Sequence, residues 1–147
     1  MAYQAKLFDE GLVNLLSGDY DPTDAIKLAI VTSAVTPTTT QVAPKLTDFT
    51  EVSDAGTYTL GGADLGLLGN LISTAGGVIT FDSTTNPSWA QDVSNGTDAR
   101  WGIIYNNTSV DKQAIGYVDL NTSINMALGT LTITWATTGI ARFQRGA

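Results

Sequence analysis

The side chains that could do chemistry in this chain are its carboxylates. The 147 residues include 14 Asp and Glu, of which Glu10 and Glu51 are the only glutamates, and they include no His and no Cys. The chain therefore lacks the most common general base, the most common metal ligand and the usual activated nucleophiles. Two carboxylates about 5 to 10 Å apart would suffice for a glycosidase, but no spacing singles out such a pair. We predict a protein that is not an enzyme and has no catalytic residue.

The densest acidic cluster, Asp19, Asp21 and Asp24, could gather oxygen ligands for Ca²⁺. It lacks the glycine and the distal glutamate that an EF-hand loop requires. Aspartate is also favoured at helix ends and in turns, where its carboxylate binds nearby backbone N–H groups. We therefore expect these residues to shape a turn, and we predict no metal site and no cofactor.

A glycine-rich stretch at residues 60–69 is a second candidate for ligand binding. It lacks the Gly-Lys-Ser/Thr ending of a phosphate-binding loop, and its glycines are not in the register of a dinucleotide-binding loop. Glycine is also the usual residue of tight turns and close backbone contacts. We expect the stretch to form a turn or to pack its backbone closely against the body.

Trp89 is the aromatic residue best suited to bind a ligand. It follows Asn86, Pro87 and Ser88 in a loop-like segment, whereas Trp101 and Trp135 lie on the apolar phase of predicted strands. A flat aromatic face can stack on a sugar ring as well as pack in a protein core. Trp89 is therefore the candidate residue for binding a glycan.

The charge of the chain limits its partners. The formal net charge is −7, the pI is near 4.1, and only 14% of the residues are charged. The 7 Lys and Arg residues are scattered, so no basic stripe could neutralise phosphates. We expect neither nucleic acid nor a membrane as partner. There is also no signal-peptide core and no run of about 20 apolar residues, which favours a protein made in a cytoplasm and kept there or in an assembly that forms there.

Residues 1–20 are predicted to form an N-terminal arm with one short amphipathic helix. Gly18 stands where such a helix would end. The helix would have to bury its apolar stripe against its own body, a sister subunit or another partner protein, and the sequence leaves these alternatives open. The apolar residues recur at steps of three and four and are Tyr3, Leu7, Phe8, Leu12, Leu15 and Leu16.

Residues 25–147 are predicted to form a β body. Apolar residues alternate with others in short segments bounded by Gly or Asn, which is typical of antiparallel strands. A long loop at 34–56 carries at most one helical turn near Leu46 to Phe49, and loops of this length are often functional. The predicted strands are 26–31, 78–81, 99–105, 113–120 and 129–136, with a further edge at 140–143.

Together these segments predict a single domain over 1–147 of the mainly β class. The expected architecture is an antiparallel β-sandwich or a jelly-roll-like barrel with a short N-terminal amphipathic helix. We place a contact surface for a partner protein or a sister copy on the arm and the long loop, because terminal segments and loops can change without disturbing a β core. Its candidate residues are Leu7, Phe8, Leu12, Leu15, Leu46 and Phe49.

An ordered series of short segments spans nearly the whole chain. The segments are 15–19 (LLSGD), 26–33 (IKLAIVTS), 51–58 (EVSDAGTY), 79–82 (ITFD), 88–89 (SW), 98–105 (DARWGIIY), 115–119 (IGYVD) and 131–140 (LTITWATTGI). In order and spacing, this series resembles a family of small bacteriophage head decoration (capsid cement) proteins. Residues 34–48 and 60–77 depart from the resemblance.

The resemblance implies a non-enzymatic virion protein on the capsid exterior, made in the host cell cytoplasm. Its implied partners are the major capsid protein and copies of itself, as a homo-oligomer such as a trimer or a dimer. The alternative that the sequence leaves open is a tail- or fibre-associated adhesin that binds host surface glycans.

Overall fold

A computed structural model of the chain describes residues 1–144 and is mainly β, with several antiparallel sheets packed together and little helix. This confirms the predicted fold class and the sandwich-like architecture. The helices and strands are β1 Ala2–Tyr3, β2 Ala5–Leu7, α1 Asp9–Ser17, β3 Ala25–Val31, the 3₁₀ turn η1 Leu46–Asp48, β4 Ala63–Leu67, α2 Leu68–Leu71, β5 Ile72–Ala75, β6 Val78–Phe81, β7 Ser88–Trp89, β8 Ala99–Asn106, β9 Ala114–Ile124, β10 Leu131–Thr132, β11 Thr134–Trp135 and β12 Ala141–Gln144.

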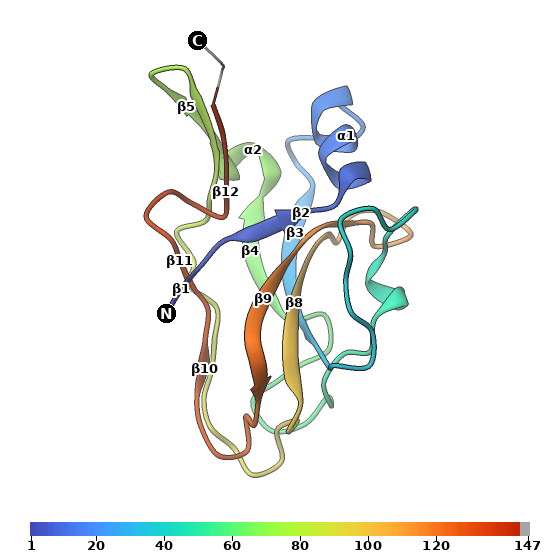
Figure 1. Ribbon diagram of the computed structural model, residues 1–147, viewed down its shortest axis with the longest axis vertical. Coiled ribbons are helices and arrows are strands. Elements are labelled where there is room, and N and C mark those ends of the chain that lie inside the picture. Colours follow the sequence, from blue (N-terminus) through green and yellow to red (C-terminus); the bar gives the residue numbers. More distant parts are fainter. Residues whose placement is uncertain (145–147) are drawn as a thin grey trace.

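The main sheet has five antiparallel strands in the order β2-β9-β8-β3-β4. Its long strands β8 and β9 run through the middle of the molecule in Figure 1. A three-stranded sheet, β12-β6-β5, rises away from one end of the body, and two short ribbons join β1 to β11 and β7 to β10. The ribbons and the smaller sheet form the second layer.

One face of the main sheet packs against that second layer. Ile26, Leu28 and Ile30 of β3 belong to the same buried cluster as Ile133 and Trp135 from the second layer. Leu131, Ile133 and Trp135 are buried and alternate with exposed threonines, as predicted for the segment 129–136. The segment is two short strands rather than one, because β10 pairs with β7 and β11 pairs with β1.

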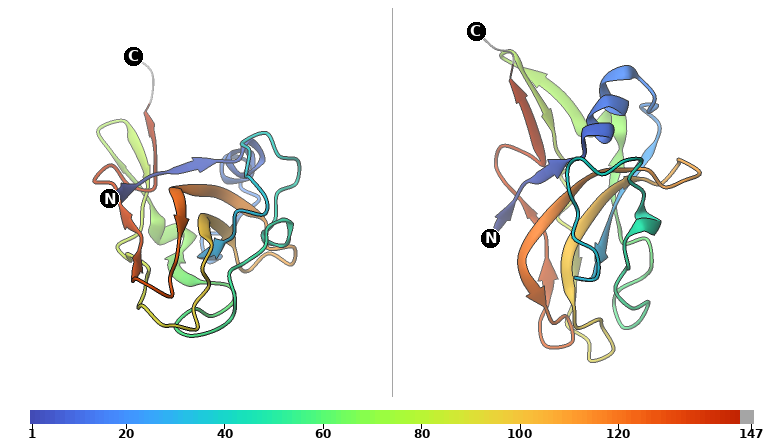
Figure 2. Two further views of the ribbon diagram at one scale, coloured as in Figure 1. Left: turned by 60° about the horizontal axis from the view of Figure 1, so that its bottom comes forward. Right: turned by 45° about the vertical axis from the view of Figure 1, so that its right-hand side comes forward.

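The other face of the main sheet is covered by the 34–56 loop and the end of the arm. Ala29 and Val31 of β3 lie there with Trp101 and Tyr117, so β3 is buried on both faces. Figure 2 shows the loop running alongside β8 and β9. Ala29 and Val31 are therefore shielded from solvent on this face, whereas Lys27 on the same face is only half-buried.

The predicted helix at the N-terminal end is shorter than its apolar spacing suggested. Residues 2–7 form β1 and β2, and only Asp9–Ser17 is helical. Gly18 ends the helix as expected, with a left-handed φ of 81° and its N–H donated to the carbonyl oxygen of Asn14. The arm is thus part strand and part helix, and its strands are paired with the body.

Candidate functional site

An apolar groove lies between α1 and the sheet β12-β6-β5. It has a volume of about 360 Å³. Figure 1 shows its two walls, the helix and the hairpin of β5 and β6, rising at the same end of the molecule. The lining side chains are Leu12, Leu15, Leu16, Ile72, Ile79, Phe81 and Phe143.

The sheet wall is built by a tight hairpin. Gly76 and Gly77 form its two-residue turn with φ of 56° and 79°, the signs that a type I′ turn requires. Strand alternation then puts Ile72, Ile79 and Phe81 on one face, which Phe143 of β12 joins opposite Ile79. The apolar face of this sheet therefore looks toward the helix.

The helix wall is held against β9 by a close backbone contact. Gly11 is buried, and a Cβ there would lie 2.4 Å from the carbonyl oxygen of Ile115. Only glycine allows α1 to approach the sheet so closely. Two apolar side chains of the helix remain exposed, Leu16 at 75% in the open groove and Val13 at 60% beside it. Part of the apolar surface of α1 therefore has no cover within its own fold.

No charged residue interrupts the groove on the sheet side. The seventeen positions from Leu65 to Phe81 contain none, although Asp64 and Asp82 flank them. The two ion pairs among the described residues lie on the main sheet and its edge, as Lys27 with Asp64 at 3.7 Å and Arg100 with Asp119 at 2.6 Å. The groove is thus an uncharged region on an acidic molecule.

The structure brings some of the predicted contact residues together and separates others. Leu12 and Leu15 line the groove, and Leu7 lines an adjoining hollow that shares Leu12 with it. Leu46 and Phe49 lie instead under the long loop, where they pack on the main sheet.

Phe8 is also interior. Its side chain is 0% exposed, and its ring lies 5.3 Å from that of Tyr117 and 6.3 Å from that of Phe49, measured between centroids. The three predicted residues Phe8, Leu46 and Phe49 therefore join the arm and the loop to the body, and their side chains are not offered to a partner.

The four groove residues on the sheet wall were not predicted as contact residues. Ile79, Phe81 and Phe143 lie in predicted strands, and Ile72 lies in a segment without a predicted strand. All four residues of β5 are exposed, so β5 shows no alternation between buried and exposed positions. The signal that could have found the hairpin is the Gly76–Gly77 pair between two β-prone segments.

Trp89, the candidate glycan-binding residue, is 6% exposed. It lies in β7, and its ring centroid is 5.7 Å from that of Tyr58. The indole belongs to the core cluster between the layers. It is therefore not presented to a sugar.

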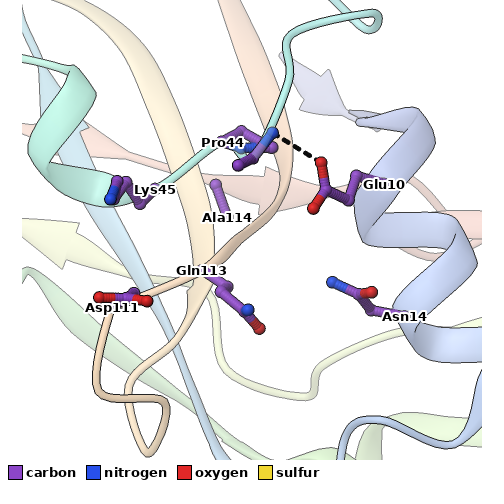
Figure 3. Close-up of a pocket in the computed structure, with 8 residues that line it drawn as sticks. Glu10, Asn14, Pro44, Lys45, Asp111, Gln113 and Ala114 are labelled. Atoms are coloured by element: carbon purple, nitrogen blue, oxygen red, sulfur yellow. Dashed lines mark hydrogen bonds between the residues drawn. The ribbon is translucent and has the colours of Figure 1, made fainter.

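A small polar pocket lies where α1 meets the long loop and the turn before β9 (Figure 3). Its volume is about 50 Å³, far below the 300–1,000 Å³ of typical ligand pockets. The carboxylate of Glu10 accepts the backbone N–H of Ala43 at 2.6 Å, while Lys45 and Asp111 lie on the opposite side of the pocket. Glu10 thus holds the loop onto the helix.

Glu51, the other glutamate, has a similar task. Its carboxylate accepts the backbone N–H of Gly61 at 2.8 Å and the hydroxyl of Tyr58 at 2.9 Å. Burial, followed by the charge of Glu51, raises the pKa of Tyr58 well above its usual range and that of Tyr105 to about 12. Both phenols therefore stay protonated and serve as hydrogen-bond donors, Tyr105 to the carbonyl oxygen of Gly61.

The aspartates at 19–24 shape the turn between α1 and β3. Asp21 accepts the N–H and the hydroxyl of Thr23, and Asp24 accepts the N–H of Asp21 and the side-chain amide of Asn106. Across residues 1–144, no three acidic side chains are grouped as a metal site would require. The glycine-rich stretch packs closely as expected, since a Cβ on Gly62 would lie 1.9 Å from a β3 carbonyl oxygen.

The chain matches no protein-family model, no curated protein and no solved structure. Within residues 1–144, no helix has the length and apolar character needed to cross a membrane. The groove is accordingly the feature from which function must be inferred.

Proposed function

We propose that this chain is a structural protein of a bacteriophage particle that binds the outer surface of the capsid and reinforces it, as a decoration or cement protein. The observation that carries the proposal is the groove between α1 and the sheet β12-β6-β5. A contiguous apolar hollow on the surface is typical of a site where another protein docks. The partner in this proposal is the major capsid protein.

Two further features support the proposal. The ordered segments resemble the phage decoration family, and two of them, 15–19 and 79–82, contribute to opposite walls of the groove. The acidic, basic-poor surface also suits the outside of a capsid better than an interior lined with DNA. The glutamates and the aspartates of the turn bind the chain's own loops, which fits a non-enzymatic role.

The test compares two substitutions on the same helix. Leu16 and Val13 are both exposed, but only Leu16 lines the groove. Leu16→Asp puts a charge into the proposed interface, and Val13→Asp puts the same charge beside it. Co-sedimentation with undecorated phage shells should show an affinity lower by about tenfold or more for Leu16→Asp, since a contact at the centre of an interface typically contributes over 1 kcal/mol.

A substitution on the opposite wall makes the test independent of the helix. Ile79 is 41% exposed in the groove, so Ile79→Lys should also weaken shell binding. Circular dichroism and melting of each variant should match wild type within a few degrees, because exposed positions change stability by about 0.5 kcal/mol or less. Equal shell binding by wild type, Leu16→Asp and Ile79→Lys would refute the groove as the capsid contact.

Deleting residues 1–18, which include the helix wall of the groove, would not test whether the groove binds shells. The deletion would remove β2, which pairs with β9, and Phe8, which is fully buried. The truncated chain would lose part of its main sheet together with the helix. Point substitutions on the exposed side of α1 separate binding from folding.

A further inference from the structure

We propose that β5 is a self-pairing edge strand through which two copies of this chain associate, antiparallel to one another. The inference concerns the free protein and does not depend on binding to a capsid. It rests on the open edge of the β12-β6-β5 sheet, on the absence of charge there and on the register that the hairpin imposes.

Proteins normally protect the edges of their sheets with charged side chains, proline, bulges or very short strands. Among the described strands, the other edges of the two larger sheets all carry a charge: Lys6 in β2, Asp64 in β4 and Arg142 in β12. The ribbons joining β1 to β11 and β7 to β10 are only two residues long. β5 has none of these protections, since its sequence is Ile-Ser-Thr-Ala in regular register with β6.

The register of the hairpin determines which backbone N–H and C=O groups of β5 are not hydrogen-bonded to β6. In a two-residue hairpin the closing pair, Ala75 with Val78, is hydrogen-bonded, and bonded and non-bonded pairs alternate from there. The N–H of Asp82 donates to the carbonyl oxygen of Leu71 at 2.8 Å, in the same alternation. The N–H and C=O groups of Ile72 and Thr74 therefore point away from β6, toward the open edge.

A second copy of β5 satisfies these four groups in one symmetric arrangement. With Ser73 opposite Ser73 of the second copy, Ile72 faces Thr74 of the second copy and Thr74 faces its Ile72. Both of these pairs are then of the hydrogen-bonded type, giving four bonds around a twofold axis. The two small sheets become one six-stranded sheet whose apolar face continues across the axis, because Ile72 and Thr74 lie on the face of Ile79.

The charge distribution favours a second copy as the occupant of this edge. Each copy carries a net charge of −7, so contact through most of its surface brings like charges together. The β5–β6 hairpin is uncharged from Ile72 to Phe81 and projects from the body in Figure 1. Pairing of four residues alone falls short of the about 1,200 Å² of a standard interface, and we therefore expect a weak dimer whose population rises with concentration.

The first test removes the free donor at the edge. Thr74→Pro deletes the outward N–H of Thr74 without deleting a bond to β6, and proline is tolerated on an edge strand in this orientation. Sedimentation velocity of the free protein over a range of concentrations should show a wild-type dimer and, for Thr74→Pro, a dimer dissociation constant higher by about tenfold or more. A second pair of variants tests charge at the edge. Thr74→Lys places a charge on β5 and should also weaken the dimer, whereas Val110→Lys places the same charge at a residue that is 97% exposed elsewhere and should not.

The second test reads the register directly. The chain has no Cys, so Ser73→Cys introduces a single thiol at the twofold axis. A non-hydrogen-bonded antiparallel pair has Cα atoms about 4.5 Å apart, within the range that a disulfide spans. Under mild oxidation Ser73→Cys should form covalent dimers faster than Thr74→Cys, whose thiols lie off the axis, and faster than Val110→Cys.

Circular dichroism of each variant shows whether it is folded, so that a change in association can be assigned to the edge strand. The proposal is supported if wild type forms dimers in a concentration-dependent way, if Thr74→Pro and Thr74→Lys weaken them, and if Val110→Lys does not. Preferential cross-linking of Ser73→Cys would support it as well. A wild-type protein that stays monomeric at every concentration would overturn it. So would association of a well-folded Thr74→Pro equal to that of wild type, or cross-linking of Ser73→Cys no faster than that of Val110→Cys.

Discussion

Replacing Phe8 with alanine should destabilise the fold itself. Phe8 stands at the junction of the arm, the long loop and the main sheet, where its ring packs between Tyr117 and Phe49. Its side chain is fully buried. The substitution leaves a cavity in this cluster and removes the apolar contact that joins the loop to β9.

The expected loss is about 3–5 kcal/mol, the usual cost of Phe→Ala in a core. A domain of this size melts about 2–4 °C lower for each kcal/mol lost, so the melting temperature should fall by about 6–20 °C. The loss is a large fraction of the roughly 5–15 kcal/mol that stabilises most domains. Part of it should come from aromatic pairing, which contributes about 0.5–1.5 kcal/mol beyond burial.

Urea denaturation followed by tryptophan fluorescence measures this loss. The control is Leu16→Ala on the same arm, which should change stability by about 0.5 kcal/mol or less because Leu16 is largely exposed. The cycle of Phe8→Ala, Phe49→Ala and the double variant should give a coupling energy of about 0.5 kcal/mol or more, since the two rings are in contact. The reasoning is refuted if Phe8→Ala melts like wild type and only loses its binding to shells.

Three further perturbations follow from local contacts. Gly62→Ala should cost about 3 kcal/mol in chemical denaturation, because φ is 68° and the new Cβ would collide with a β3 carbonyl oxygen, whereas Gly129→Ala meets no atom within 4 Å and should be nearly neutral. The hydroxyls of Ser123 and Ser33 donate to the carboxylate of Asp98 and lower its pKa below the ordinary range. This stabilisation is present above the ordinary pKa and is lost as the pH falls through the lowered, folded-state pKa. The melting advantage of wild type over Asp98→Asn should therefore be constant above about pH 5 and shrink below about pH 4, and an advantage that grows on acidification would contradict this. EDTA should leave the melting temperature unchanged, because the aspartates of the turn after α1 already bind donors of their own turn, and a fall of about ten degrees or more would reveal a bound metal.

The arm illustrates why an apolar spacing alone did not decide secondary structure. Tyr3, Ala5 and Leu7 are half-buried and alternate with exposed residues, so the same positions fit a strand as well as a helix. Pairing of β2 with β9 and of β1 with β11 selects the strand, and those partners are remote in sequence. The helical spacing is satisfied only after Phe8, where no partner strand is available to Asp9–Ser17.

The candidate contact surface was predicted only in part because exposure is a property of the tertiary structure. Leu12 and Leu15 could be assigned from the helical stripe. The composition of the 34–56 loop does not show whether the side chains of Leu46 and Phe49 point outward or inward. Both are buried, because they pack on the apolar face of β3 and β8 that the loop covers. Ile72 was missed because β5 is exposed on both sides and has no burial period to recognise. Ile79 lies in the predicted strand 78–81, but the sequence pattern does not show that its side chain is 41% exposed in the groove.

The pairing of β1 with β11 and of β2 with β9 has a consequence for how the chain folds. The early segment Ala5–Leu7 finds its partner only at Gly116–Val118, and Tyr3 finds its partner at Trp135. Loop-closure entropy must be lost before such distant pairs form, which makes folding slow, on the millisecond-to-second scale of β proteins with non-local topology. During synthesis, the arm is made well before β9. Phe8 and the apolar side chains of α1 therefore stay exposed to solvent or chaperones until most of the chain has been made. Refolding monitored by hydrogen exchange should therefore show the first residues acquiring protection among the last.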